Sequence, residues 1–166
     1  MSAVARRLAV HSLTVAARPE RVRDVRRYVA AALGSAHPCL DAATKVVSEL
    51  VTNAVLYGSP GADATIKVRV RLLRHRRVRL TVIDKGGTGH VPKLRQPDGD
   101  DPNGRGLLIV NALACRWDWA RHRSGHKIRA LLDPVRPGPD ALAETGPAID
   151  LEAIFALDEA MNLEGS

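Results

Sequence analysis

Glu49 and Asn53 place a carboxylate and an amide four residues apart in the mostly apolar stretch "SELVTNAVLYG" (residues 48–58). Residues at this spacing lie about one turn apart on the same face of a helix, so both side chains would point the same way. Such a pair can line a ligand site, or it can be the solvated edge of an amphipathic helix. The spacing alone leaves both interpretations open.

Asp84 ends the apolar stretch "VRLTVID" and is followed directly by "KGG". A carboxylate at a strand end can accept a hydrogen bond from an exocyclic amine of a flat ligand, and the glycines that follow let the backbone approach that ligand. A site built around such a bond discriminates strongly against analogues that lack the donor. The alternative is an Asp in an ordinary turn, because Asp and Gly both favour turns.

Gly104, Arg105 and Gly106 precede the apolar stretch "LLIVNAL". A helix that begins here would present free backbone N–H groups and the positive end of its dipole, which favour a phosphate group. Glycine allows close approach, and the arginine can add a charge-assisted hydrogen bond. The segment is neither a dinucleotide-binding fingerprint nor a P-loop, because it lacks the third glycine of the first and the Gly-Lys-Ser/Thr of the second.

The elements that would position these residues follow from the apolar periodicity and from Pro and Gly. The pattern predicts strands over 7–16, 64–74, 76–84, 116–122 and 126–133, and helices over 19–33, 38–57 and 106–115. Between the third strand and the third helix lies "KGGTGHVPKLRQPDGDDPNGRG", a loop of a length that is usually functional or disordered. This order predicts an α+β fold: a two-layer sandwich in which helices cover one face of a single mixed or antiparallel sheet.

Composition narrows the class of protein. The chain has 166 residues, of which 45% are hydrophobic, and no apolar run approaches the roughly 20 residues that a membrane-spanning helix needs. Cys39 and Cys115 lie far apart without metal-ligand spacing, which favours two buried or inert thiols in a reducing cytoplasm. We therefore expect a cytoplasmic protein.

Only five aromatic residues are available to stack on bases, so direct nucleic-acid binding through the basic residues is the weakest of the options considered.

The charge is divided unevenly along the chain. Residues 1–132 carry 24 Lys or Arg and 10 Asp or Glu, a net charge of +14, whereas residues 133–166 carry 1 and 8, a net charge of −7. After Pro134 the sequence becomes rich in Pro and Gly, and it ends in an acidic segment that is amphipathic as a helix. We predict one domain over 1–133 and an acidic linker and tail over 134–166, with the tail contacting the basic body or a partner.

Taken in order, Glu-x-x-x-Asn on a helix, a strand-end Asp-x-Gly and a Gly-x-Gly-Leu that opens a helix resemble the histidine-kinase-like ATPases of the Bergerat fold. The resemblance covers about residues 8–132. The stretches "ELVTNAVLYG" and "GRGLLIVNALACRWDW" are especially similar to the small anti-sigma-factor serine/threonine protein kinases of actinobacteria. The resemblance implies binding of ATP and Mg²⁺.

The resemblance also implies a role for each candidate residue. Glu49 would be the general base, and Asn53 would help to hold Mg²⁺ beside the phosphates. Asp84 would accept a hydrogen bond from the adenine amino group, in a pocket shaped by Gly86, while residues 88–103 would close over the nucleotide. The phosphates would be contacted by Gly104, Arg105 and Gly106.

By the same resemblance, the chain would phosphorylate a serine or threonine of a small antagonist protein and sequester a sigma factor, and a homodimer is compatible with it. The alternative is a non-catalytic, ATP-sensing protein-interaction module. This chain departs from its relatives in two places. It has "DKGGTG" where Asp-x-Gly-x-Gly is common, and it has His126 and Lys127 where a small or hydroxylated residue usually follows Gly. The second change can alter the adenine pocket or the nucleotide preference.

Overall fold

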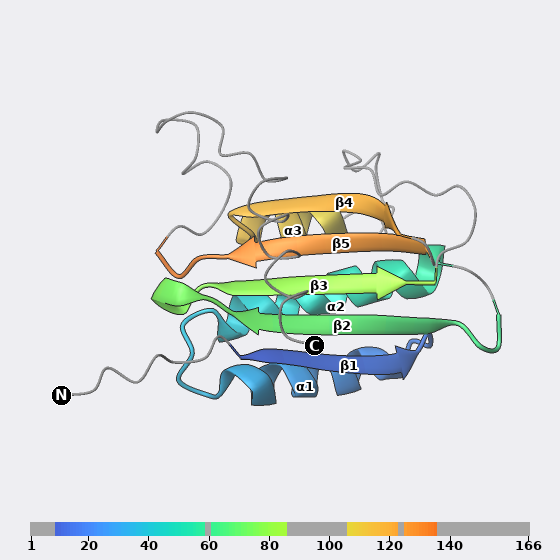
Figure 1. The fold of residues 1–166 in the computed structure, drawn as a ribbon, viewed down its shortest axis with the longest axis horizontal. Coiled ribbons are helices and arrows are strands. Elements are labelled where there is room, and N and C mark those ends of the chain that lie inside the picture. The colour runs from blue at the N-terminus through green and yellow to red at the C-terminus, as the bar shows by residue number, and fades with distance from the viewer. Residues whose placement is uncertain (1–8, 59–60, 86–105, 123–124, 136–166) are drawn as a thin grey trace, which may run out of the picture.

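The computed structural model describes residues 9–58, 61–85, 106–122 and 125–135, with His122 described by its backbone alone. The elements along the chain, drawn in Figure 1, are β1 (Val10–Ala16), α1 (Arg21–Leu33), α2 (Leu40–Tyr57), β2 (Thr65–Leu72), η1 (Arg74–Arg76), β3 (Val78–Asp84), α3 (Gly106–Leu113), β4 (Arg116–His122) and β5 (Gly125–Leu132). The predicted order of strands and helices is confirmed. Each helix is two residues shorter than predicted: α1 and α2 begin two residues later, and α3 ends two residues earlier.

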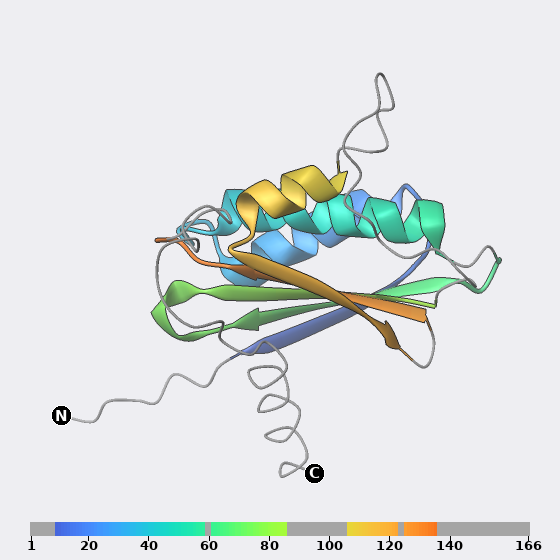
Figure 2. The same cartoon turned by 90° about the horizontal axis from the view of Figure 1, so that it is seen from above.

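The five strands form one sheet in the order β1-β2-β3-β5-β4. Every neighbouring pair is antiparallel, so the sheet is antiparallel throughout and not mixed. The described helices all lie on one side of the sheet, as Figure 2 shows, and its other face carries none of them. The predicted two-layer α+β architecture, consistent with the Bergerat fold, is therefore confirmed.

α2 is the central helix, and it packs between α1 and α3 and against the sheet. Its buried residues recur at the three- and four-residue spacing of one helix face: Ala43, Val46, Val47, Leu50, Val51 and Ala54. The strands complement this face by alternation, because every second residue of β2 (Ile66, Val68, Val70) is fully buried beneath the helices. No helix within the described ranges is long and apolar enough to cross a membrane.

The turn between β2 and β3 has an unusual backbone. The predicted strands over 64–74 and 76–84 follow each other closely, and η1 supplies the turn between them with positive φ angles at His75 (58°) and Arg76 (57°). Left-handed backbone costs a non-glycine residue roughly 1–2 kcal/mol. Contacts with the segment before α2 offset that strain, since Arg76 Nη2 donates to the Ala36 carbonyl over 2.7 Å and Cys39 Sγ donates to the Arg76 carbonyl over 3.6 Å.

Both cysteines are buried free thiols, as predicted. Burial raises the pKa of Cys39 and of Cys115, so neither sulfur is activated as a thiolate. Several other predictions fall outside the described residues: the loop over 88–103, Gly86, Gly104, Arg105 and the tail from residue 136 onward. The boundary between domain and tail at 133/134 therefore stays a prediction.

Candidate functional site

Gly106 brings the start of α3 against α2. A Cβ atom built on Gly106 would lie 2.7 Å from Glu49 Oε2, 3.5 Å from Asn53 Oδ1 and 3.6 Å from Asn53 Nδ2. Glu49 and Asn53 lie at the flank of the buried face of α2, where both are half-buried. The structure thus joins three of the sequence-predicted site residues, and any residue larger than glycine at position 106 would displace the carboxylate.

The Glu49 carboxylate therefore lies at the N-terminus of α3, where free N–H groups and the helix dipole favour negative charge. Within the described ranges no group of three or more His, Cys, Asp or Glu side chains is arranged to hold a metal ion unaided. The oxygens that meet at Gly106 do suit Mg²⁺, which prefers oxygen ligands and commonly combines one or two protein groups with substrate phosphates. The donor set fits a metal–phosphate ligand better than a bare ion.

Asp84 is the last residue of β3 and is only 8% exposed. It continues the alternation of Leu80 and Val82, so its side chain lies on the helix-covered side of the sheet. The backbone N–H of His126 on β5 donates a hydrogen bond to Asp84 Oδ1 over 2.9 Å. The carboxylate thus belongs to a buried polar site and not to an exposed turn, which was the alternative interpretation.

His126, one of the two residues at which the sequence departs from the resemblance, lies beside Asp84. It is 6% exposed, and its Nδ1 lies 3.6 Å from Asp84 Oδ1. Its ring also packs edge-on against Trp119 of β4, with centroids 6.2 Å apart and planes at 64°. Lys127 pairs with Ile83 and therefore lies on the opposite face of the sheet. Of the two unusual residues, only His126 adjoins the proposed adenine acceptor.

Gly58, which the sequence analysis did not single out, lies between the end of α2 and Asp84. A Cβ atom on Gly58 would overlap the backbone oxygen of Ala54 and would lie 3.8 Å from Asp84 Cβ. Glycine is therefore required by the backbone at the end of α2, and this end lies in ordinary contact with the end of β3. The signal in the sequence was present, since Gly58 directly follows the helix that carries Glu49 and Asn53.

These contacts arrange the candidate residues along the length of α2. Glu49 and Asn53 meet Gly106 within the C-terminal half of α2. Gly58 contacts Asp84 just after the helix, nine residues beyond Glu49. Nine residues of helix span about 14 Å at about 1.5 Å per residue. The arrangement suits an elongated ligand with an amine-bearing ring at the Asp84 end and anionic groups at the α3 end.

Comparisons with known proteins identify the family of the chain. A protein-family profile described as "Histidine kinase-like ATPase domain" matches residues 15–132. Among solved structures, the chain is similar to the histidine kinase domain from the Erythrobacter litoralis EL346 blue-light activated histidine kinase, with a TM-score of 0.46 and 17% identity over 70% of this chain and 61% of that chain. It thus spans less than two thirds of that domain's chain. No curated protein matches.

Proposed function

The chain belongs to the histidine kinase-like ATPase domain family, and we propose that it is an ATP-binding regulator of the anti-sigma-factor type with serine/threonine kinase activity. Its substrate would be a small antagonist protein, and its second partner would be a sigma factor. The observation that carries the proposal is the meeting of Glu49, Asn53 and Gly106 at the start of α3. Family membership supports ATP binding, whereas the substrate and partners are supported by the resemblance of the motifs.

Adenine recognition would fall to Asp84. Its Oδ1 is held by the His126 backbone, which fixes the plane of the carboxylate and leaves Oδ2 to accept a hydrogen bond from the adenine amino group. A buried acceptor of this kind favours ATP over a purine that presents a carbonyl at the same position, because two acceptors facing each other cannot form a hydrogen bond. Gly86, outside the described residues, would shape the same pocket.

The phosphates would lie at the other end, against the N-terminus of α3. Gly106 permits close approach there, and Gly104 and Arg105 would add a backbone and a guanidinium contact. Asn53 Oδ1 would help to hold Mg²⁺, which when bound neutralises charge on the phosphates. Phosphoryl transfer depends mainly on such positioning and charge neutralisation.

Glu49 would act as the general base. Its carboxylate would accept the proton of the substrate hydroxyl as that oxygen bonds to the γ-phosphorus. The bond between the γ-phosphorus and the bridging oxygen breaks, and ADP leaves. A base in hydrogen-bond reach contributes roughly 10²–10⁴-fold to rate. The half-buried position of Glu49 beside Gly106 supports this role.

The same contact favours a second candidate function. A carboxylate at the start of α3 also stabilises that helix without any chemistry, and Glu49 would then serve a non-catalytic, ATP-sensing interaction module. In that module ATP would order the site, and the surface around it would bind a protein partner. The two functions differ in whether phosphate leaves the nucleotide.

The discriminating experiment compares Glu49→Gln with Asn53→Ala. Calorimetric titration with Mg-ATP measures binding, and transfer of labelled γ-phosphate to partners captured on the protein measures kinase activity. We expect Glu49→Gln to bind Mg-ATP within about threefold of wild type while transfer falls roughly 10²–10⁴-fold, and Asn53→Ala to lose Mg²⁺-dependent binding. Asp41→Asn is the control, because it makes a carboxylate-to-amide change at the exposed far end of α2.

Transfer by Glu49→Gln at the wild-type rate would contradict the kinase proposal. If the wild type transfers no phosphate to any captured partner and yet binds Mg-ATP, the sensing module is favoured. Failure of Mg-ATP to bind the wild type would contradict both.

A further inference from the structure

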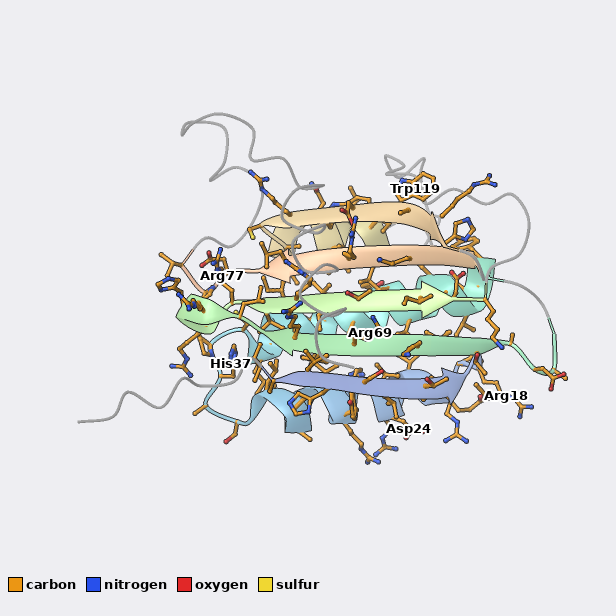
Figure 3. The ribbon with its side chains drawn as sticks, in the orientation of Figure 1. Arg18, Asp24, His37, Arg69, Arg77 and Trp119 are labelled. Carbon is orange, nitrogen blue, oxygen red and sulfur yellow. The ribbon has the colours of Figure 1, made fainter. Side chains whose placement is uncertain are left out.

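The open face of the sheet, opposite the helices, is strongly basic. Strand register places seven cationic side chains on it: Lys67, Arg69 and Arg71 of β2, Arg79 of β3, Arg116 of β4, and Lys127 and Arg129 of β5. Asp118 is the one carboxylate that the described strands place on this face. Figure 3 looks onto it and labels Arg69 on β2. We call this surface the basic face.

The cations of the basic face stand close enough to oppose one another. Arg79 is 7% exposed, and its pKa is lowered to about 10, first by burial and then by the positive charges of Arg71 and Arg129. Asp118 offsets part of this charge through two hydrogen bonds of 2.7 Å to Arg129. Counted over the described strand residues, the face carries seven cations and one carboxylate, and a face of this net charge favours an anionic occupant.

Apolar side chains are set among these cations. Ile83 of β3, Leu131 of β5 and Ala120 of β4 share the face by register and are half-buried, and Val10 at the β1 edge is 53% exposed. A simple polyanion such as nucleic acid would satisfy the charges but would leave these groups unmatched. A segment that carries both carboxylates and apolar side chains matches the whole face.

The chain contains such a segment in residues 149–164. It carries five acidic residues and no basic residue. Its apolar residues recur at helical spacing: Leu151, Ile154, Phe155, Leu157 and Met161. Within this chain, it is therefore the segment whose charge and apolar content both complement the basic face.

The connection is long enough for the segment to reach the face. β5 is an inner strand of the sheet and ends at Leu132. Residues 136–148 provide 13 residues that link this end to the segment. An extended chain of that length reaches about 43 Å at about 3.3 Å per residue. The five strands span only about 19 Å at about 4.8 Å between neighbours. Tethering also gives the segment an effective concentration in the millimolar range.

We propose that residues 149–164 dock as an acidic amphipathic helix on the basic face of their own chain. Docking would neutralise charge at the centre of the sheet and cover Ile83 and Leu131. It would also keep the face from nucleic acid and other anionic partners unless one displaces the segment. The proposal does not depend on phosphoryl transfer, because the basic face lies on the other side of the sheet from Glu49 and Asn53.

Carbodiimide cross-linking of the full chain tests the docking directly, since it joins a lysine amine only to a carboxylate in contact with it. Lys67 and Lys127 lie on the basic face, whereas Lys45 lies on α2 in the other layer with its side chain 58% exposed. We expect peptides that link Lys67 or Lys127 to acidic residues of 149–164, and none that link Lys45 to them. The yield should fall at least fivefold at about 0.5 M salt, where screening is strong.

An equal mixture of unlabelled and ¹⁵N-labelled chains shows whether the link forms within one chain. Arg69→Glu should reduce the Lys67 cross-link severalfold, and Arg26→Glu, the same change on exposed α1 in the helix layer, should leave it unaltered. Circular dichroism verifies that both variants are folded. Links to Lys45 in equal yield, links only between chains, or no link to the basic face would each overturn the proposal.

Discussion

His126 and Asp84 are joined twice across the sheet: the backbone N–H of His126 donates to Asp84 Oδ1 over 2.9 Å, and the imidazole Nδ1 lies 3.6 Å from the same oxygen. Both side chains are nearly buried. The backbone bond fixes one carboxylate oxygen by the pairing of β3 with β5, whatever side chain stands at position 126. The imidazole contact, in contrast, depends on the side chain, and the two contributions can be separated by mutation.

Asp84→Asn should abolish selective ATP binding without disturbing the fold. The amide keeps Oδ1 as acceptor for the His126 N–H but replaces Oδ2 with an NH₂ donor, which would face the adenine amino group. A buried donor left without an acceptor costs about 1–3 kcal/mol, so ATP should bind roughly 5- to 150-fold more weakly. Calorimetry measures the affinity, and Asp63→Asn in the exposed segment before β2 is the control. Unchanged ATP affinity would remove Asp84 from the site.

His126→Ser should retain the fold and the preference for ATP, because the bond to Asp84 comes from the backbone. The change removes a buried ring from the proposed adenine end, and the resemblance implies a small or hydroxylated residue there. We expect ATP to bind up to about tenfold more tightly, a gain of about 1.4 kcal/mol. Arg121→Ser, at the neighbouring exposed position of β4, is the matched control. A loss of ATP binding would show that the imidazole itself contacts the nucleotide.

Gly106→Ala should impair function more than stability. The added Cβ would lie 2.7 Å from Glu49 Oε2, but that atom ends a flexible side chain and can swing aside at small cost. We therefore expect the urea midpoint to change little, while Mg-ATP affinity falls at least tenfold, because the added methyl group stands where the phosphates would approach the start of α3. Gly61→Ala is the control, since a Cβ there meets nothing within 4 Å. A large loss of stability with intact binding would contradict this account.

His37 should make stability depend on pH. The Cys39 N–H donates to His37 Nδ1 over 3.1 Å just before α2 begins, and the pKa of His37 is lowered by burial and by the charge of Arg76. The folded state therefore binds the proton less readily than the unfolded chain. The contribution of His37 to stability is present above the unfolded pKa near 6.5 and is lost as pH falls through that value towards the lower folded pKa.

We expect the urea midpoint of the wild type to fall between about pH 7.5 and about pH 5.5. His37→Asn should show a smaller fall, because an amide oxygen can accept the Cys39 N–H without titrating. His75→Asn, at the exposed turn η1, should follow the wild type. Identical pH profiles for all three proteins would show that His37 is not the group responsible.

Arg129→Lys should weaken the attachment of the edge strand β4. Arg129 of β5 donates two hydrogen bonds of 2.7 Å to Asp118 of β4, and a lysine cannot reproduce that planar pair. The side chains are 14% and 23% exposed, so we expect a loss of about 1 kcal/mol in the free energy of unfolding. Arg121→Lys, exposed on β4, is the control. Equal stability of both variants would mean that the bidentate pair contributes nothing measurable.

The sequence by itself determined the local elements and the residue types of the site. The spacing of apolar residues and the glycines that end helices are short-range signals, and α2, α3 and every strand could be predicted from them. The four-residue spacing of Glu49 and Asn53 likewise placed both on one side of α2. Even the antiparallel closing pair β4 and β5 was readable, because its strands are neighbours in the chain. Gly58 was visible only as part of a helix stop.

Tertiary structure alone decided which of these residues meet. That Gly106 lies against Glu49 depends on how α3 packs on α2, and that His126 rather than Lys127 adjoins Asp84 depends on the register of β5 against β3. The gathering of seven cations on one face likewise needs the alternation of four strands in a fixed register. A shift of one residue in that register would send each side chain to the other face, so the pairing of strands that are distant in the sequence, such as β3 with β5, decides which side chains share a face.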